Sequence, residues 1–211
     1  MKLISVNIGR PQVTPSGKRT GIYKEPSLVP VRVTALGLEG DAVLDTRHHG
    51  GTDQAVYVYS ASDYAWWAKQ LGRELAPGTF GDNLTFDTYA SAEAGIGDRF
   101  HLGDVVLEVT APRIPCGTLE GRMAEPGFIK QFIAAERPGV YCRVIQPGLL
   151  KADVAVRVEP YDRGERVLSL ELFRAFYTSQ HTPEAIQRFL AAPIAERSRR
   201  EHERELEKLS G

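Results

Sequence analysis

One cysteine lies in a setting that favours chemistry over packing. In the segment APRIPCGTLEGR, residues 111–122, Cys116 follows two prolines and precedes a glycine, with Arg113 and Arg122 nearby. Neighbouring cations lower the pKa of a thiol and favour the thiolate, which binds metal ions and attacks electrophiles. The other cysteine, Cys142, lies in the apolar segment VYCRVI and is expected to pack as a small hydrophobic residue. We therefore expect a functional role for Cys116 alone.

A second segment combines imidazoles with carboxylates. GLEGDAVLDTRHHGGTDQAV, residues 37–56, holds five such side chains within thirteen positions: Asp41, Asp45, His48, His49 and Asp53. Histidine and aspartate are ordinary ligands of zinc and iron. Adjacent histidines point to opposite sides of an extended chain, so both could bind one ion only in a tight turn, which the following glycine pair would allow. The alternative is a structural loop, in which the aspartates make local hydrogen bonds and one histidine packs beside a tyrosine.

A third segment is basic. SGKRTGIYKEP, residues 16–26, places Lys18, Arg19 and Lys24 around two glycines. Glycine backbone can turn amide groups toward an anion, and three cations can neutralise a phosphate. The alternative is an ordinary solvated loop, because basic loops with glycine are common on protein surfaces.

Composition limits the class of protein that carries these segments. The 211 residues are 42% hydrophobic, enough for one sizeable core and a small appendage. The formal net charge of -1 argues against nucleic acid or an anionic membrane as a partner, so an anion site must be local. Two cysteines are too few for a disulfide-built secreted scaffold, and no apolar run reaches signal-peptide length or the ~20 residues of a membrane span. We expect a cytoplasmic protein with reduced thiols.

Short strands must position these segments through most of the chain. Apolar residues alternate with other types from 29 to 35, and denser apolar runs cover 55–59, 105–109, 140–145 and 154–158. Many short strands separated by loops predict a β-barrel or sandwich over residues 1–160. A polar linker, YDRGER, then leads to helical periodicity.

Helices are expected inside the β region and again after it. One is capped by Ser60 or Ser62, and another begins near Phe128 and ends near 137–139. After the linker, Ser169 starts a candidate helix, and Thr182 followed by proline predicts the start of the next. Residues 196–211 contain five acidic and five basic side chains, which predicts a solvated, frayed helix and not an anion-binding patch. The alternative is a helix that binds a partner.

Five segments, in order along the chain, are similar to the successive motifs of YiiM-type MOSC proteins, a family named for the C-terminal domain of molybdenum cofactor sulfurases. They are TGIYKEP, GDAVLDTRHHGGTDQAVYVY, FGDNLT, IGDRFHLGDVVLEVTAPRIPC and GVYCRVIQPG. The resemblance implies a mainly β fold: a strongly bent, closed β-barrel domain with a few helices over residues 1–160. It also implies a small C-terminal α-helical domain over residues 165–211.

The resemblance further implies a site for the pterin-based molybdenum cofactor, molybdopterin. Cys116 is then the molybdenum ligand, and a soft thiolate suits a metal already held by dithiolene sulfurs. His48 and His49 are the further candidate catalytic residues, as proton donors or as hydrogen-bond partners of the pterin. The implied cofactor-binding residues, some of which would meet its terminal phosphate, are Lys18, Arg19, Lys24, Arg47, Asn83 and Arg113.

Three functions stay open on the sequence. The first, implied by the resemblance, is reduction of small N-hydroxylated compounds to amines with electrons from a separate reductase. The second is a module that carries the cofactor, or a persulfide sulfur on Cys116, to another protein. The third follows from the residues without the family and is a zinc or iron hydrolase built on His48 or His49 with Asp53. For a shared cofactor site, we expect six residues to converge on one cleft: Lys24, His48, His49, Asn83, Arg113 and Cys116.

Overall fold

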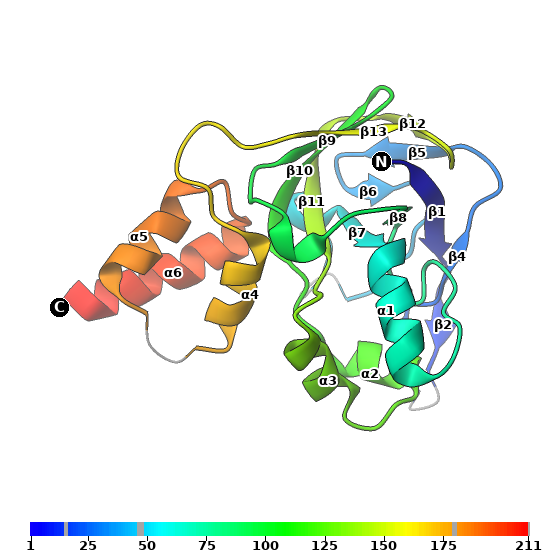
Figure 1. Ribbon diagram of the computed structural model, residues 1–211, viewed down its shortest axis with the longest axis horizontal. Coiled ribbons are helices and arrows are strands. Elements are labelled where there is room, and N and C mark those ends of the chain that lie inside the picture. The colour runs from blue at the N-terminus through cyan, green and yellow to red at the C-terminus, as the bar shows by residue number, and fades with distance from the viewer. Residues whose placement is uncertain (15–16, 46–48, 179–180, 211) are drawn as a thin grey trace.

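The computed structural model describes residues 1–14, 17–45, 49–178 and 181–210, which contain thirteen strands and six α-helices (Figure 1). The strands are β1 (Leu3–Gly9), β2 (Gln12–Val13), β3 (Arg19–Thr20), β4 (Lys24–Pro26), β5 (Val31–Thr34), β6 (Gly37–Leu38), β7 (Val56–Ser60), β8 (Leu84–Phe86), β9 (Arg99–Leu102), β10 (Val105–Pro112), β11 (Val140–Gln146), β12 (Gly148–Leu150) and β13 (Val156–Glu159). The α-helices are α1 (Ala61–Leu71), α2 (Gly117–Met123), α3 (Phe128–Ala135), α4 (Ser169–Phe176), α5 (Pro183–Ala191) and α6 (Glu196–Ser210). Two short 3-10 helices cover Thr52–Gln54 and Ser91–Glu93.

Eight strands form one mixed sheet in the order β13-β9-β10-β11-β7-β8-β1-β4. Neighbours pair antiparallel except β7 and β8, which are parallel because α1 and the loop after it return the chain to the same end of the sheet. A smaller sheet, β12-β5-β6, and the pair β2-β3 complete the strands. Four of the five predicted strand runs therefore lie in this mostly antiparallel sheet, and the run at 29–35 lies in the smaller one.

The predicted closed barrel is wrong, since the described residues contain no closed ladder. Closure would need the end strands β13 and β4 to pair, and they do not. The start of β1, the strand next to the end strand β4, instead meets the segment before β13. The contact consists of an isolated bridge between Lys2 and Ala155 and a few backbone hydrogen bonds, such as that from the N–H of Leu3 to the carbonyl of Val154 at 2.9 Å. The reason lies in β1, whose residues from Asn7 to Gly9 already pair with β4, so only its first residues reach the segment before β13.

The predicted helix caps are confirmed. Ser60 accepts a hydrogen bond of 3.1 Å from the backbone N–H three residues ahead, and Gly72 ends α1 in the left-handed conformation at φ 62°. Thr182 caps α5 in the same way at 3.2 Å, with Pro183 as the first helical residue. No helix in the described part of the chain is both long enough and apolar enough to cross a membrane.

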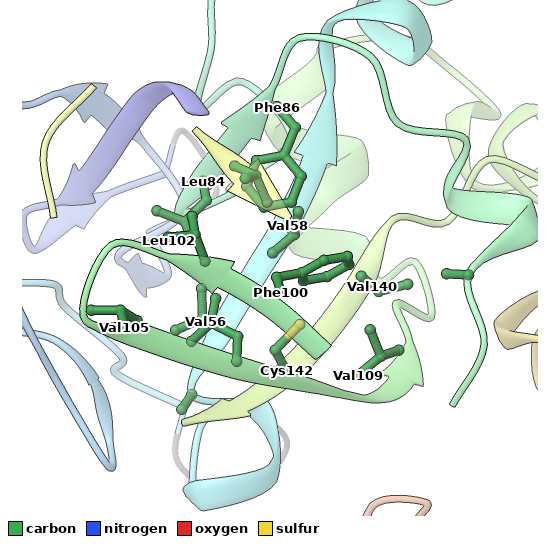
Figure 2. Close-up of a cluster of buried hydrophobic side chains, with 14 of the residues drawn as sticks. Val56, Val58, Leu84, Phe86, Phe100, Leu102, Val105, Val109, Val140 and Cys142 are labelled. Atoms are coloured by element: carbon green, nitrogen blue, oxygen red, sulfur yellow. The ribbon is translucent and has the colours of Figure 1, made fainter. Parts of the chain in front are cut away.

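Strand β7 separates two buried clusters. Its valines, Val56 and Val58, belong to the core of the sheet, whereas Tyr57 and Tyr59 belong to an aromatic cluster with α1 and α3. This division follows from the alternation of side chains along a strand. Figure 2 shows the sheet core, whose labelled members also include Leu84, Phe86, Phe100, Leu102, Val105, Val109, Val140 and Cys142.

The C-terminal helices pack on the sheet. Leu172 of α4 and Phe189 of α5 belong to the same buried cluster as the sheet residues, and Figure 1 shows α4, α5 and α6 together beside β10 and β11. A helical C-terminal region is therefore present. Its separation from residues 1–160 as an independent domain stays a prediction.

Candidate functional site

One pocket collects residues from loops that are far apart in the sequence. Segments near residues 18–24, 41–45, 81–83 and 113–118 all border it. It brings together seven of the predicted site residues: Lys18, Arg19, Lys24, His49, Asn83, Arg113 and Cys116. Arg47 and His48 lie outside the described residues. The geometry thus agrees with a shared site, and the individual roles stay predictions.

Close backbone packing holds the basic segment against the acidic one. A Cβ atom on Gly21 would lie 1.8 Å from the carbonyl oxygen of Ala42, so only glycine fits at this position. The contact brings Lys18 and Arg19 to the same pocket as the loop that contains Asp41.

Cys116 occupies the connection between strand β10 and helix α2. β10 ends at Pro112 and α2 begins at Gly117, so the thiol lies directly before the first helical turn. Pro115 restricts the preceding backbone, which keeps this connection in place. The side chain is half-buried and lines the pocket.

The surroundings of Cys116 favour the thiolate. Burial acts to raise the pKa of the thiol, but a hydrogen bond with His49 and the positive charge of Arg113 together outweigh burial and lower the pKa to about 6. The backbone N–H of Leu119, in the first turn of α2, acts in the same direction. The thiol is therefore mostly ionised at neutral pH.

Arg113 supplies a positive charge near the thiol. Its side chain is buried, its Nη1 donates a hydrogen bond of 2.7 Å to the carbonyl of Phe80, and its guanidinium lies 4.8 Å from the ring centre of Tyr57. Its Nε is buried and has no hydrogen-bond partner among the described residues. One donor of this buried cation thus remains available to a ligand.

Lys24 and Asn83 form a buried polar network with Asp41. The Nζ of Lys24 lies 2.5 Å from Asp41 Oδ1, and Nδ2 of Asn83 donates to Asp41 Oδ2 at 2.8 Å. The other end of the Asn83 amide accepts a hydrogen bond of 3.1 Å from the backbone N–H of Tyr57. Burial lowers the pKa of Lys24, although Asp41 acts to raise it. These two predicted cofactor-binding residues thus have their main partners within the protein and help to build the pocket wall.

Lys18 and Arg19 differ from Lys24 because both are exposed. The Nζ of Lys18 lies 3.8 Å from a carboxylate oxygen of Asp45, with more than half of the lysine side chain exposed, so solvent screens this pair. The two cations form the basic rim of the pocket and are the residues best placed to meet an anion from solvent.

The hydrolase alternative finds little support in the described residues. Asp53, its proposed carboxylate, lies 3.0 Å from Arg143 and accepts a hydrogen bond of 2.8 Å from the backbone N–H of Glu196. It therefore anchors the start of α6. Among the residues that the structure describes, His49 belongs to no group of three metal-ligand side chains.

Cys142 behaves as predicted. It is fully buried on β11 within the core of the sheet, and burial, assisted by the charge of Glu108, raises the pKa of its thiol. The prediction that only Cys116 has a reactive thiol is consistent with this contrast between the two pKa shifts.

A second cleft meets the pocket at Cys116 and extends to the C-terminal helices. Its far wall carries side chains of α4 and α6: Leu172, Phe176, Arg197, Ser198, Glu201, His202 and Arg204. The shared residues of the two cavities include His49, Gln54, Cys116 and Tyr141. Cys116 thus lies where a narrow pocket and a wider cleft join.

The predicted frayed tail is wrong, because α6 is held in place. Besides the contact of Asp53 with its first turn, Arg199 donates hydrogen bonds of 2.9 Å to the carbonyls of Leu190 and Ala192. The mixed charges of this segment do not indicate which side of the helix faces the cleft. The sequence therefore did not predict that Arg197 and Arg204 line it. It also missed Tyr141, whose position in an apolar strand indicates packing.

Comparisons with known proteins agree with the motifs. The uncharacterized protein YflK of Bacillus subtilis is 33% identical over 193 residues, 90% of this chain and 86% of its own length. Protein YiiM of Escherichia coli is 29% identical over 184 residues, 85% of this chain and 80% of its own. A protein of Gibberella moniliformis named reductase is 35% identical over 150 residues, 68% of this chain but 27% of its own length.

The fold is also found in a solved structure. The crystal structure of YiiM from Geobacillus stearothermophilus superposes with a TM-score of 0.78 at 23% identity, covering 97% of this chain and 98% of that one. The MOSC domain family model matches residues 45–157, more than half of the chain, including β7, β10 and Cys116. On this match and on the similarity to its relatives, the chain belongs to the MOSC domain family and is YiiM-like.

Proposed function

We propose that this protein binds the molybdenum cofactor and reduces N-hydroxylated compounds to amines, with Cys116 as the molybdenum ligand. Membership of the MOSC family supports a function related to this cofactor, and the relative named reductase supports redox chemistry. The observation that carries the proposal is the position of Cys116: an ionised, half-buried thiol at the junction of a pocket with a basic rim and a wider cleft.

The residues of the pocket fit the cofactor. Its rim offers Lys18 and Arg19 to a phosphate, and its interior offers a soft thiolate to a metal. Two buried polar atoms without partners among the described residues belong to residues of this pocket: Nε of Arg113, a donor, and Oε1 of Gln54, an acceptor. A polar ring system such as a pterin would satisfy both, because buried polar groups are stable only when hydrogen-bonded.

The thiolate of Cys116 would hold the metal. With a pKa of about 6 the side chain has about ten thiolates for each thiol at pH 7, so no proton has to be removed by another group before binding. When bound and reduced by a separate reductase, the cofactor would supply the two electrons that the reaction needs.

His49 is the proton donor in this proposal. The overall reaction takes a hydroxylamine, two electrons and two protons to an amine and water: the N–O bond breaks, the oxygen leaves as water and the nitrogen gains the N–H bond. His49 makes a hydrogen bond with Cys116 and lines both cavities, so its imidazole would lie next to a metal held by this thiolate. An imidazole can pass a proton to the leaving hydroxyl at neutral pH.

The wider cleft would admit the substrate. Ile114 and Phe176 give it apolar surface, and α6 adds Arg197 and Arg204. The narrow pocket would then serve the cofactor, and the two would meet at Cys116.

The test is to produce wild type, Cys116→Ser and Cys142→Ser in a host that synthesises the cofactor. Molybdenum and pterin are measured in each protein, and amine formation from a hydroxylamine is followed with an artificial electron donor. Wild type should contain both and be active. Cys116→Ser should keep part of the pterin but lose almost all activity, because a hydroxyl is a harder and far less acidic ligand. Cys142→Ser is the matched control and should keep its activity, with a loss of folding stability at most.

Three other outcomes would contradict the proposal or part of it. Full activity of Cys116→Ser would remove the ligand assignment. Cofactor-loaded wild type without any activity would favour the carrier function, in which Cys116 transfers the cofactor or a persulfide sulfur. Absence of both molybdenum and pterin from the wild-type protein would contradict the proposal. Zinc that is retained in His202→Gln but lost in His49→Leu would then favour a metal-dependent hydrolase.

A further inference from the structure

A cluster of potential metal ligands lies in the C-terminal helical region, apart from the pocket around Cys116. It consists of His181, just before α5, with His202 and Glu205 on α6. One ligand atom from each of the three lies within 4.8 Å of the others. Figure 1 shows α5 and α6 side by side at the end of the chain, which is how residues far apart in sequence come together here.

His181 is oriented as a metal ligand would be. Its Nε2 lies 3.0 Å from the backbone carbonyl of Ala175, which can only accept a hydrogen bond, so Nε2 carries a proton. A metal-binding histidine typically donates its second ring nitrogen to a carbonyl in this way, which fixes the tautomer. The other nitrogen, Nδ1, then presents its lone pair to the carboxylate of Glu205 at 2.7 Å. Two lone pairs at this distance repel each other unless a cation, either a proton or a metal ion, lies between them.

His202 adds a second nitrogen without a partner. Its Nδ1 is buried, has no hydrogen-bond partner among the described residues and lies 3.8 Å from Oε2 of Glu205, beyond hydrogen-bond distance. An orphaned buried nitrogen beside a carboxylate is unfavourable unless something binds there.

The spacing suits a small divalent cation. Tetrahedral zinc, with Zn–N distances of ~2.0 Å, separates neighbouring ligand atoms by about 3.3 Å. The two nitrogen-to-oxygen distances of 2.7 and 3.8 Å lie on either side of this value. The ring of Phe189 packs near both imidazoles, at 6.5 Å from His181 and 5.3 Å from His202, and provides an apolar wall.

We propose that His181, His202 and Glu205 form a zinc site that ties the segment before α5 to α6. Two imidazoles and one carboxylate are a regular zinc ligand set with a fourth position for water. His202 also lines the wider cleft that reaches Cys116. The site does not depend on the proposed molybdenum function.

The test measures zinc directly on the full-length protein without a histidine tag. Cys116→Ser serves as the background, because a thiolate beside His49 would bind zinc by itself. In this background, His181→Gln and His202→Gln are compared with the matched control His101→Gln, whose histidine pairs with Glu159 elsewhere in the protein. Glutamine keeps a polar side chain in each place but is a poor zinc ligand. Zinc is titrated against a chromophoric chelator, and cobalt is added as a spectroscopic probe.

The background protein and the His101→Gln control should each bind one zinc ion per chain. Their cobalt forms should show a tetrahedral visible spectrum without the near-ultraviolet band of a thiolate ligand. His181→Gln and His202→Gln should lose this binding while circular dichroism shows that both remain folded. Failure of the background protein to bind zinc would show that a proton holds His181 to Glu205, and zinc binding that survives His202→Gln would place the metal elsewhere. Either result overturns the proposal.

Discussion

Removal of the imidazole of His49 should raise the pKa of the Cys116 thiol. The ordinary thiol value here is 9.0, and the surroundings lower it to about 6. At pH 7 this changes the ratio of thiolate to thiol from about 1:100 to about 10:1, which corresponds to about 4 kcal/mol. Among the influences that lower the pKa, the hydrogen bond with His49 is the largest, and burial opposes it. In His49→Leu only Arg113 and the backbone remain to offset burial, so the pKa should move from about 6 toward 9.

The assay follows alkylation of Cys116 by iodoacetamide as a function of pH. The pH at the midpoint of the profile is compared between variants. A rate at a single pH is less informative, because a thiolate of higher pKa is intrinsically more nucleophilic and this partly offsets its lower abundance. Cys116→Ser gives the background from Cys142, which is buried and should not react. His101→Leu is the matched control, because His101 pairs with Glu159 and has no contact with the pocket.

The direction in which the pH midpoint of alkylation moves is specific to this explanation. Wild type should lose reactivity as the pH falls through about 6, and His49→Leu should lose it at a distinctly higher pH. A wild-type midpoint near 9 would show that the pocket does not stabilise the thiolate. An unchanged midpoint in His49→Leu would assign the stabilisation to Arg113 and remove His49 from the site.

Two further predictions concern stability. Lys24→Met should lower the free energy of unfolding by about 3–5 kcal/mol, because it leaves the buried carboxylate of Asp41 without its cation. Urea denaturation measures this change. A loss below about 1 kcal/mol would mean that hydrogen bonds alone satisfy Asp41. Asp53→Ala should cost about 1 kcal/mol and speed amide hydrogen exchange in the first turn of α6, because Asp53 accepts a hydrogen bond from the backbone N–H of Glu196. Unchanged exchange in that turn would show that the contacts of Arg199 suffice to hold the helix.

Local signals were sufficient for several parts of the molecule. Ser60 and Thr182 cap helices as predicted, because a cap depends on a side chain and a backbone group only a few residues apart. The buried apolar run of β7 and the contrast between Cys116 and Cys142 also follow from neighbours in the sequence. The order of the motifs along the chain is sufficient to indicate the MOSC family.

Other local patterns were too weak to interpret. Helix α2, directly after Cys116, was missed because the segment GTLEGRM contains two glycines, which are poor helix formers. The expected closed barrel failed because the ends of a sheet close only if two particular strands pair, and β1 already pairs with β4 over its second half. No local pattern in either strand encodes that choice.

By itself, the sequence determined which cysteine belongs to the pocket and which to the core, the basic and acidic loops, the main strands and the family. These features depend on residue type and on the order of neighbouring residues, so they can be inferred without knowledge of the fold. Only the tertiary structure decided the partners. It paired Lys24 with Asp41. It also made the charged helix α6 a wall of the cleft next to Cys116 and placed His181 beside His202. The physical reason is that such contacts join residues distant along the chain, and their energies depend on burial and distance, which exist only after the chain has folded.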